Sequence, residues 1–123
     1  MSDFPVRMPD YSGLLNEIGT AMQRKDNPAG YMYERIAAML QSHQDLLSDN
    51  EELGVYVVGG SAPAFHLRSI TYSNPDILRF IGKDADGNAV QLLQHYSQMG
   101  IMVVSMPKLE EKVYRIGFNP AKG

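Results

Sequence analysis

The sequence contains no cysteine, no tryptophan and no long apolar run. The absence of cysteine excludes disulfide bonds, thiolate zinc sites and cysteine nucleophiles, and it fits a cytoplasmic protein, which is the compartment we expect. Apolar runs such as 100–104 are far shorter than a membrane span, so we expect no membrane association. The first residues do not combine a basic region with an apolar one, so we expect no secretory signal.

Positive charge is also scarce, because 11 lysine and arginine residues stand against 14 aspartate and glutamate residues, for a formal net charge of −3. A protein that binds nucleic acid through its whole surface is usually basic. Any nucleic-acid site in this chain would therefore have to be a local feature. The chain has 123 residues, 44% of them hydrophobic, which is enough for one domain with a core.

Helical periodicity is confined to the first part of the chain. We interpret residues 1–26 as an N-terminal arm with a short helix over 11–24, where apolar residues recur at helical spacing although glycines weaken it. Asn27, followed by a proline, is typical of a helix start, and the apolar stripe that follows predicts a helix over 28–47. His43 lies in the row of this stripe, so we expect it to be packed or half-buried.

From residue 53 the pattern changes to that of short strands. Apolar alternation and turn residues predict five strands and a sixth: 55–59, 65–72, 77–83, 89–95, 101–106 and 113–118. In the second strand the apolar residues switch faces near Arg68 and Ser69, which indicates a bulge that lets the sheet curve. We therefore predict one domain over 27–118, mainly β with an N-terminal helix (α+β). It would be a small closed barrel of five to six antiparallel strands, with a tail over 119–123.

Two short motifs have the look of ligand-binding loops but are better interpreted as turns. Asp84, Asp86 and Asn88 have the one-three-five spacing of a calcium loop, yet the glycine and the glutamate that such a loop needs at positions six and twelve are missing. They predict a hairpin turn instead. Gly59 and Gly60 are not followed by the lysine of a phosphate-binding loop, so we expect a turn there too.

The residues that could carry catalysis do not form a recognisable site. The three histidines are not paired at metal-ligand spacing, and no serine lies in a nucleophile-elbow pattern. We therefore predict no catalytic residue, no metal site and no cofactor. Glu51 and Glu52 look like solvated surface, and we expect His66 to be exposed or paired with an acid. An enzyme would require a pocket that holds His66 or His95 with a carboxylate within hydrogen-bonding reach.

Several motifs spread over 27–118 resemble a family of small bacterial proteins classed only as a domain of unknown function. They are Asn27-Pro28-Ala29, Tyr31-Met32-Tyr33-Glu34-Arg35, Asn74-Pro75-Asp76, Asp86-Gly87-Asn88, Val90-Gln91-Leu92-Leu93-Gln94-His95, Ser97-Gln98, 104–108 and Arg115-Ile116-Gly117-Phe118. The match is fairly specific. It brings no activity with it.

At the level of the fold, the order of elements is similar to Sm-like proteins, especially the bacterial RNA chaperone type (Hfq). The residues that carry the resemblance are the helix, then Val55-Tyr56-Val57-Val58-Gly59-Gly60, a long bent strand, and Gln94-His95 before the last strand. The resemblance implies an SH3-like barrel that forms a ring, in which the fourth strand of one subunit pairs with the fifth of the next. It also implies that residues at the turn between these strands contact RNA.

Two functional hypotheses follow, with an enzyme ranked below both. The first is a ring-forming homo-oligomer that binds single-stranded RNA near Gln94, His95, Tyr96 and Gln98. There Gln94 and His95 would donate hydrogen bonds, and Tyr96 would stack on a base. The alternative is a protein–protein interaction module that binds a protein partner by strand addition or through its helix, with no affinity for nucleic acid.

Overall fold

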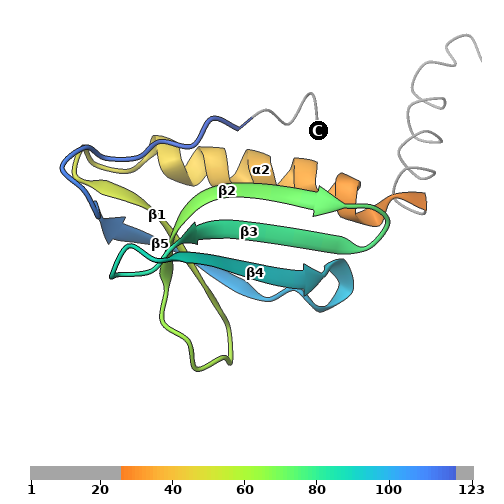
Figure 1. The fold of residues 1–123 in the computed structure, drawn as a ribbon. Coiled ribbons are helices and arrows are strands. Elements are labelled where there is room, and N and C mark those ends of the chain that lie inside the picture. The colour runs from red at the N-terminus through yellow and green to blue at the C-terminus, as the bar shows by residue number, and fades with distance from the viewer. Residues whose placement is uncertain (1–25, 119–123) are drawn as a thin grey trace, which may run out of the picture.

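The computed structural model describes residues 26–118 as one helix followed by five strands (Figure 1). The elements are α2 (Pro28–Asp45), β1 (Glu51–Val57), β2 (Phe65–Ser73), β3 (Ile77–Lys83), β4 (Ala89–His95), the short 3₁₀-helix η1 (Tyr96–Gln98) and β5 (Ile101–Pro107). The mainly β layout with an N-terminal helix is thus confirmed. The helix predicted over 11–24 and the tail predicted over 119–123 lie outside the described residues.

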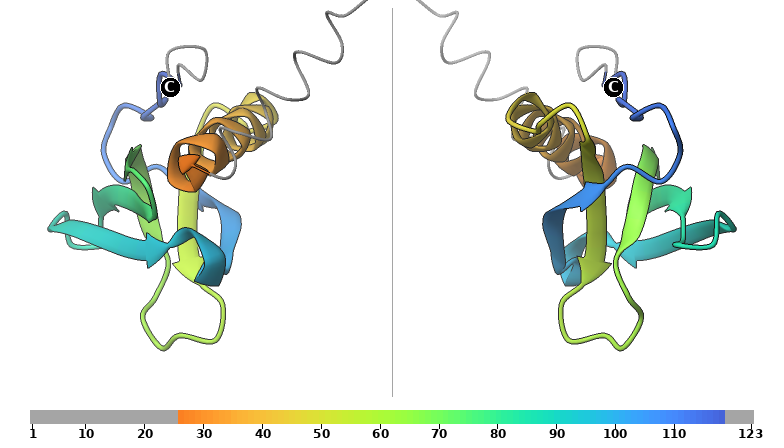
Figure 2. Two further views of the ribbon diagram at one scale, coloured as in Figure 1. Left: turned by 90° about the vertical axis from the view of Figure 1, so that its right-hand side faces the viewer. Right: turned by 90° about the vertical axis from the view of Figure 1, so that its left-hand side faces the viewer.

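The five strands form one antiparallel sheet in the order β4-β3-β2-β1-β5. Viewed from its end, the sheet curls into a half-barrel (Figure 2). The barrel is not closed as predicted, because β4 and β5 are its two edges and do not pair with each other. One face of the sheet, here called the inner face, carries Val55 and Phe80 and packs against α2.

The predicted strand boundaries hold best in the middle of the sheet. β3 and β4 begin and end where the alternation predicts, whereas β1, expected over 55–59, runs from Glu51 to Val57. The predicted bulge is confirmed by a shift of the β2–β3 register between Leu67 and Ser69. At this bend a Cβ on Gly82 would collide with the backbone carbonyl of His66, so only glycine permits the close approach of the two strands.

Helix α2 is capped by a residue from another part of the chain. The side chain of Asn27, the predicted cap, makes no capping hydrogen bond. Instead, the N–H of Gly30 donates to Oδ1 of Asn74 at 2.9 Å, and the N–H of Ala29 donates to the carbonyl of Pro75 at 2.9 Å. The turn between β2 and β3 therefore satisfies the free amides at the helix start and fixes the helix against the sheet. The helix ends at Asp45, before the predicted residue 47.

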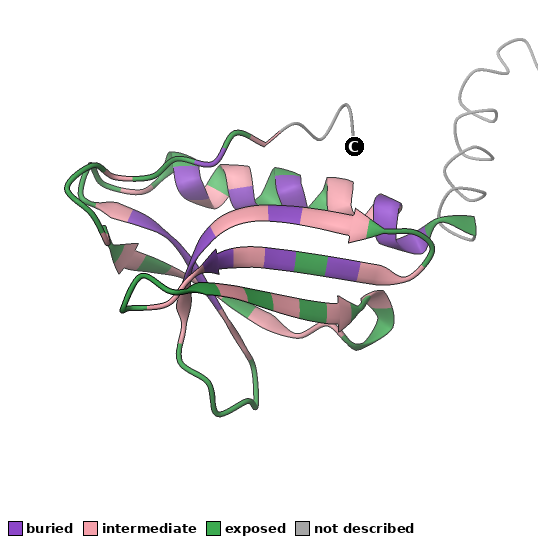
Figure 3. Ribbon diagram, in the orientation of Figure 1, coloured by how far each residue is buried: buried purple, intermediate pink, exposed green. Residues whose placement is uncertain are grey.

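The hydrophobic core lies between α2 and the inner face of the sheet (Figure 3). Its buried members are Ile36, Leu40, Leu53, Val55, Leu67, Ile70, Leu78, Phe80 and Ile116. Strand β3 alternates between these buried residues and more exposed ones, as expected for a sheet with one covered face, whereas residues 52–55 of β1 are all buried. His43 is half-buried, as predicted, and its Nε2 lies 3.2 Å from Oγ of Ser105 on β5.

Residues 113–118 do not form the predicted sixth strand. This segment, here called the C-terminal strap, has no regular secondary structure and runs beside α2 (Figure 1). The buried amide of Gln44 on α2 exchanges two hydrogen bonds with the backbone of Ile116, at 2.9 and 3.0 Å. The guanidinium of Arg115 donates to the carbonyls of Glu51 and Ser48 at 2.6 and 2.8 Å. The strap is therefore held by hydrogen bonds between side chains and backbone, and not by the backbone hydrogen bonds that a sixth strand would make.

Candidate functional site

The turn after β4 brings His95 and Tyr96 together. Their rings stack with centroids 4.9 Å apart. Nδ1 of His95 accepts a hydrogen bond from the N–H of Ser97 at 3.2 Å and lies 2.8 Å from Oγ of the same serine. His95 thereby caps the short helix η1, and its side chain remains 44% exposed. Two of the four residues predicted to contact RNA thus stack on each other, with the His95 ring exposed and the Tyr96 ring half-buried against the core.

The other two predicted residues do not join this surface in the same way. Gln98 is exposed on η1, but Gln94 is half-buried, and strand alternation turns its side chain to the inner face, away from that of His95. Oε1 of Gln94 is buried and accepts no hydrogen bond within the described part of the chain. The carboxylate of Asp76 also works against RNA binding here. Its Oδ2 lies 3.8 Å from Nε2 of His95, and its negative charge repels the phosphates of a nucleic acid.

The edge strands β4 and β5 are the second feature with functional meaning. Each has seven residues, and each pairs on one side only, β4 with β3 and β5 with β1. Leu93 on β4 is 61% exposed and Met102 on β5 is 45% exposed. Their strand neighbours Leu92 and Val103 lie opposite Phe80 and Val55 on the inner face. Because adjacent strand residues point to opposite faces, Leu93 and Met102 point to the outer face, away from the core.

A charged cluster is buried between β1 and β2. Oε2 of Glu52 lies 2.7 Å from Nδ1 of His66 and 3.1 Å from the guanidinium of Arg68. Oε1 of Glu52 accepts the N–H of Tyr114 from the C-terminal strap at 3.1 Å, and Arg68 lies over the ring of that tyrosine at 4.5 Å. Glu52 is 1% exposed and His66 is 4% exposed. The expectation of a solvated Glu52 is therefore wrong, and His66 is the acid-paired residue that the sequence left as one alternative.

The environment of Glu52 favours its ionised form. Burial by itself would raise the pKa of this carboxyl, but the hydrogen bonds from Tyr114, Arg68 and His66 and the charge of Arg68 outweigh burial and lower the pKa. The cluster joins β1, β2 and the strap. A charge that is buried and paired in this way is a fixed element of the fold.

The sequence gives no local signal that identifies this cluster. Gly54 pairs with His66 across the strands, but the space beside Gly54 is filled by the side chain of Met106. The partners of Glu52 are set by the pairing register of β1 and β2, which is not visible in the sequence.

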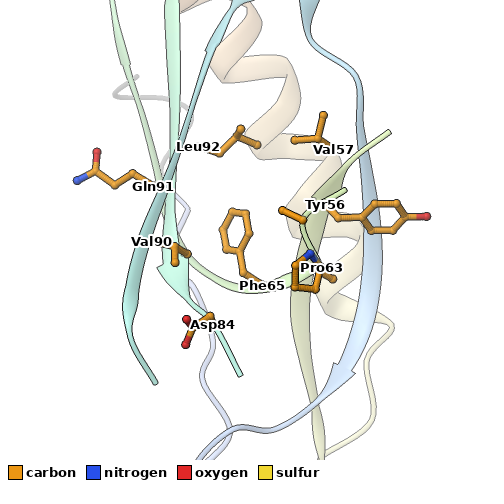
Figure 4. Close-up of a pocket in the computed structure, with 10 residues that line it drawn as sticks. Tyr56, Val57, Pro63, Phe65, Asp84, Val90, Gln91 and Leu92 are labelled. Carbon is orange, nitrogen blue, oxygen red and sulfur yellow. The ribbon is translucent and has the colours of Figure 1, made fainter. Parts of the chain in front are cut away.

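An apolar cavity of about 290 Å³ lies on the inner face of the half-barrel (Figure 4). Its lining residues are Tyr56, Val57, Ala62, Pro63, Ala64, Phe65, Asp84, Val90, Gln91 and Leu92. Neither His66 nor His95 is among them, so the cavity does not provide the histidine pocket that an enzyme of the kind considered above would require. Within residues 26–118, no group of three or more potential ligands is arranged to hold a metal ion.

Comparison with known proteins identifies a family without an assigned activity. The family model of DUF6173, a family of unknown function, matches residues 20–119, and the chain belongs to this family. Comparison with the curated proteins and with the solved structures gives no match. The resemblance to Sm-like proteins therefore stays a prediction. No helix in the described residues has both the length and the apolar character needed to cross a membrane.

Proposed function

We propose that this protein is an assembly module in which β4 of one copy pairs with β5 of the next. The single observation that carries the proposal is the pair of free edges at opposite ends of one curled sheet. A free edge offers unpaired backbone N–H and C=O groups to another strand. Because the two edges are different surfaces, their pairing is head-to-tail, and it produces a ring if the rotation between copies closes.

The composition of the edges supports this proposal. Proteins that must stay monomeric protect free edges with lysines, other charges or prolines. Strands β4 and β5 contain no lysine, arginine, aspartate or glutamate, and their one proline is Pro107, the last residue of β5. Pairing would also place Leu93 and Met102 on the same face of a continuous sheet, where both side chains would lose exposed apolar surface.

The test is the native mass of the protein measured by light scattering during size-exclusion chromatography. We expect wild-type protein to have the mass of several subunits, and we expect Leu93→Lys and Met102→Lys to shift it to the monomer. The matched control is Met39→Lys, because Met39 is 62% exposed on α2 and belongs to neither edge strand. A monomeric wild-type protein at tens of micromolar, or equal loss of mass in the control, contradicts the proposal.

A second candidate function, binding of single-stranded RNA at the turn after β4, is favoured by the stack of the exposed His95 ring on the half-buried Tyr96 ring. Base stacking on such rings does not require a basic protein, although phosphate contacts do. The test is fluorescence anisotropy with a labelled single-stranded RNA over a series of salt concentrations. Tyr96→Ala should weaken binding, whereas Gln94→Ala should leave it unchanged because that side chain faces the core. RNA binding that is absent at low salt removes this candidate and leaves the assembly proposal intact.

A further inference from the structure

The C-terminal strap is bound through its backbone by two buried side chains, Gln44 and Glu52, here called the strap site. The amide of Gln44 donates to the carbonyl of Ile116 at 3.0 Å and accepts its N–H at 2.9 Å. The carboxylate of Glu52 accepts the N–H of Tyr114 at 3.1 Å. These bonds require an extended segment with the right side chains between them, and they do not depend on which copy of the chain supplies it.

The route from β5 to the strap site passes close to β3. Strand β5 ends at Pro107, which pairs with Glu51 at the start of β1. The connector that follows, residues 108–112, has no regular secondary structure. It reaches the side of β3, because the carboxylate of Glu110 lies 3.3 Å from the ammonium group of Lys83. The strap therefore begins from a point near β3, although β3 is separated from β5 by two strands in the sheet order.

The proposed edge pairing brings the end of a partner's β5 to this same side of β3. A register with Leu93 opposite the partner's Met102 joins the two exposed apolar side chains on the outer face. The same antiparallel register places Ala89 opposite the partner's Met106. Because Ala89 pairs with Lys83, the partner's β5 would end only two strand positions away from Lys83.

This separation is short enough for the partner's connector to bridge. Neighbouring strands lie about 4.8 Å apart, so the partner's Pro107 would lie about 10 Å from Lys83. Three residues of extended chain also span about 10 Å, which would bring the partner's Glu110 to the ion pair that Glu110 forms within one copy. From that point, the partner's strap and the chain's own strap would follow the same course to the strap site.

We propose that in the assembly each strap occupies the strap site of the partner whose β4 pairs with its β5. This inference rests on the proposed function. Exchange of an identical segment between copies keeps the contacts of the strap site, and only residues 108–112 change course. Each contact between copies then includes the three backbone hydrogen bonds to Gln44 and Glu52 and the burial of Ile116, which is 8% exposed.

The experiment introduces two thiols into the full chain, which has no native cysteine. Gly117→Cys places one thiol on the strap, at a position where a Cβ has no neighbour within 4 Å. Gln41→Cys places the second on α2, three residues before Gln44 and on the same face of the helix. The matched control replaces this second change by Ser42→Cys, an exposed position on the opposite side of the helix from Gln44. Native mass is recorded first, and a short bis-maleimide then links the thiols before separation under denaturing conditions.

We expect the chain with Gly117→Cys and Gln41→Cys to form covalent dimers and longer products, because its two thiols would bridge neighbouring copies. Addition of Leu93→Lys should separate the copies, return each strap to its own site and leave only links within one chain. The Ser42→Cys control should give few links of either kind.

The proposal is overturned if the native mass is that of several subunits but the links form within one chain. Edge pairing would then stand without exchange of straps. It is also overturned if the control links copies as well as the Gln41→Cys chain does. A monomeric native mass overturns the proposed function and the exchange together.

Discussion

Among single residues, Glu52 connects the largest number of separate segments described above. Its carboxylate contacts His66 and Arg68 on β2 and the N–H of Tyr114 on the C-terminal strap. A buried ion with all of its partners in place is tolerated, but removal of one partner leaves an uncompensated charge in a dry environment. The strap is therefore tied to the sheet by an interaction that depends on the ionisation of one side chain.

The first prediction concerns the pH dependence of stability. Because the folded-state pKa of Glu52 lies below its ordinary value of 4.5, its contribution is complete above about pH 5 and is lost as the pH falls through the folded pKa. We expect Glu52→Gln to lower the free energy of unfolding at pH 7 by about 3 kcal/mol. We also expect the variant to lose less stability than wild type between pH 7 and pH 3.5, measured by urea unfolding.

The control for this prediction is Glu110→Gln. Glu110 forms an exposed ion pair with Lys83 at 3.3 Å, and such pairs contribute little. We expect this variant to stay within about 0.5 kcal/mol of wild type at pH 7 and to keep the wild-type pH dependence. If the two variants behave alike, Glu52 is not a buried, paired carboxylate in solution.

The second prediction concerns the contribution of the buried Gln94 side chain to stability. Because Oε1 of Gln94 is buried and accepts no hydrogen bond from the described residues, a methionine of similar shape should be better tolerated there than the amide. We expect Gln94→Met to raise the free energy of unfolding by about 1 kcal/mol, measured by urea unfolding. A loss of stability would mean that the amide is hydrogen-bonded in solution and that its placement on the inner face is wrong.

Among the elements, helix α2 depends on the turn between β2 and β3 for the cap at its start. Asn74 provides the side-chain oxygen that the sequence assigned to Asn27. The third prediction follows from this exchange of roles: Asn74→Ala should lower the free energy of unfolding by about 1 kcal/mol, whereas Asn27→Ala should change it by less than about 0.5 kcal/mol. Thermal or urea unfolding of the two variants checks the difference. The reverse ranking would contradict the capping geometry.

How much of each element could be predicted depended on whether local pattern or distant contact decided it. β3 and β4 alternate regularly between turns, so period and turn chemistry were sufficient to place them. The bulge at Arg68 was visible because the apolar residues change faces within one strand. The strap was predicted as a strand because Tyr114, Ile116 and Phe118 alternate. Its structure is instead decided by Gln44 and Glu52, which lie more than sixty positions away in the chain.

The candidate site was predictable to a smaller extent. His95 and Tyr96 could be placed at the turn after β4 because they lie where a regular strand ends. Gln94 was assigned to the same surface because it is adjacent in sequence, although adjacent strand residues point to opposite faces. The burial of Glu52 could not be predicted, since charged residues are rarely buried without partners and those partners are set by the register of β1 and β2.

For the whole molecule, the open half-barrel explains why assembly is the function that the geometry supports best. Closing the sheet would remove both edges, but here β4 and β5 each keep one unpaired side, and neither strand contains a lysine, arginine, aspartate or glutamate. The inner face is filled by α2 at one end and holds the cavity at the other. The family match over residues 20–119 covers the helix and all five strands, so this arrangement is what we expect other members to share.

The most direct test of edge pairing is a cross-linking experiment, which the absence of native cysteine makes clean. Copies that carry Leu93→Cys are mixed with copies that carry Met102→Cys, refolded together and treated with a short bis-maleimide. Met39→Cys replaces either partner in the control. The account predicts covalent dimers in the mixture of the two edge variants, and little or none in either variant alone or with the control. Equal cross-linking in all mixtures, or none in the edge mixture, would contradict pairing between β4 and β5.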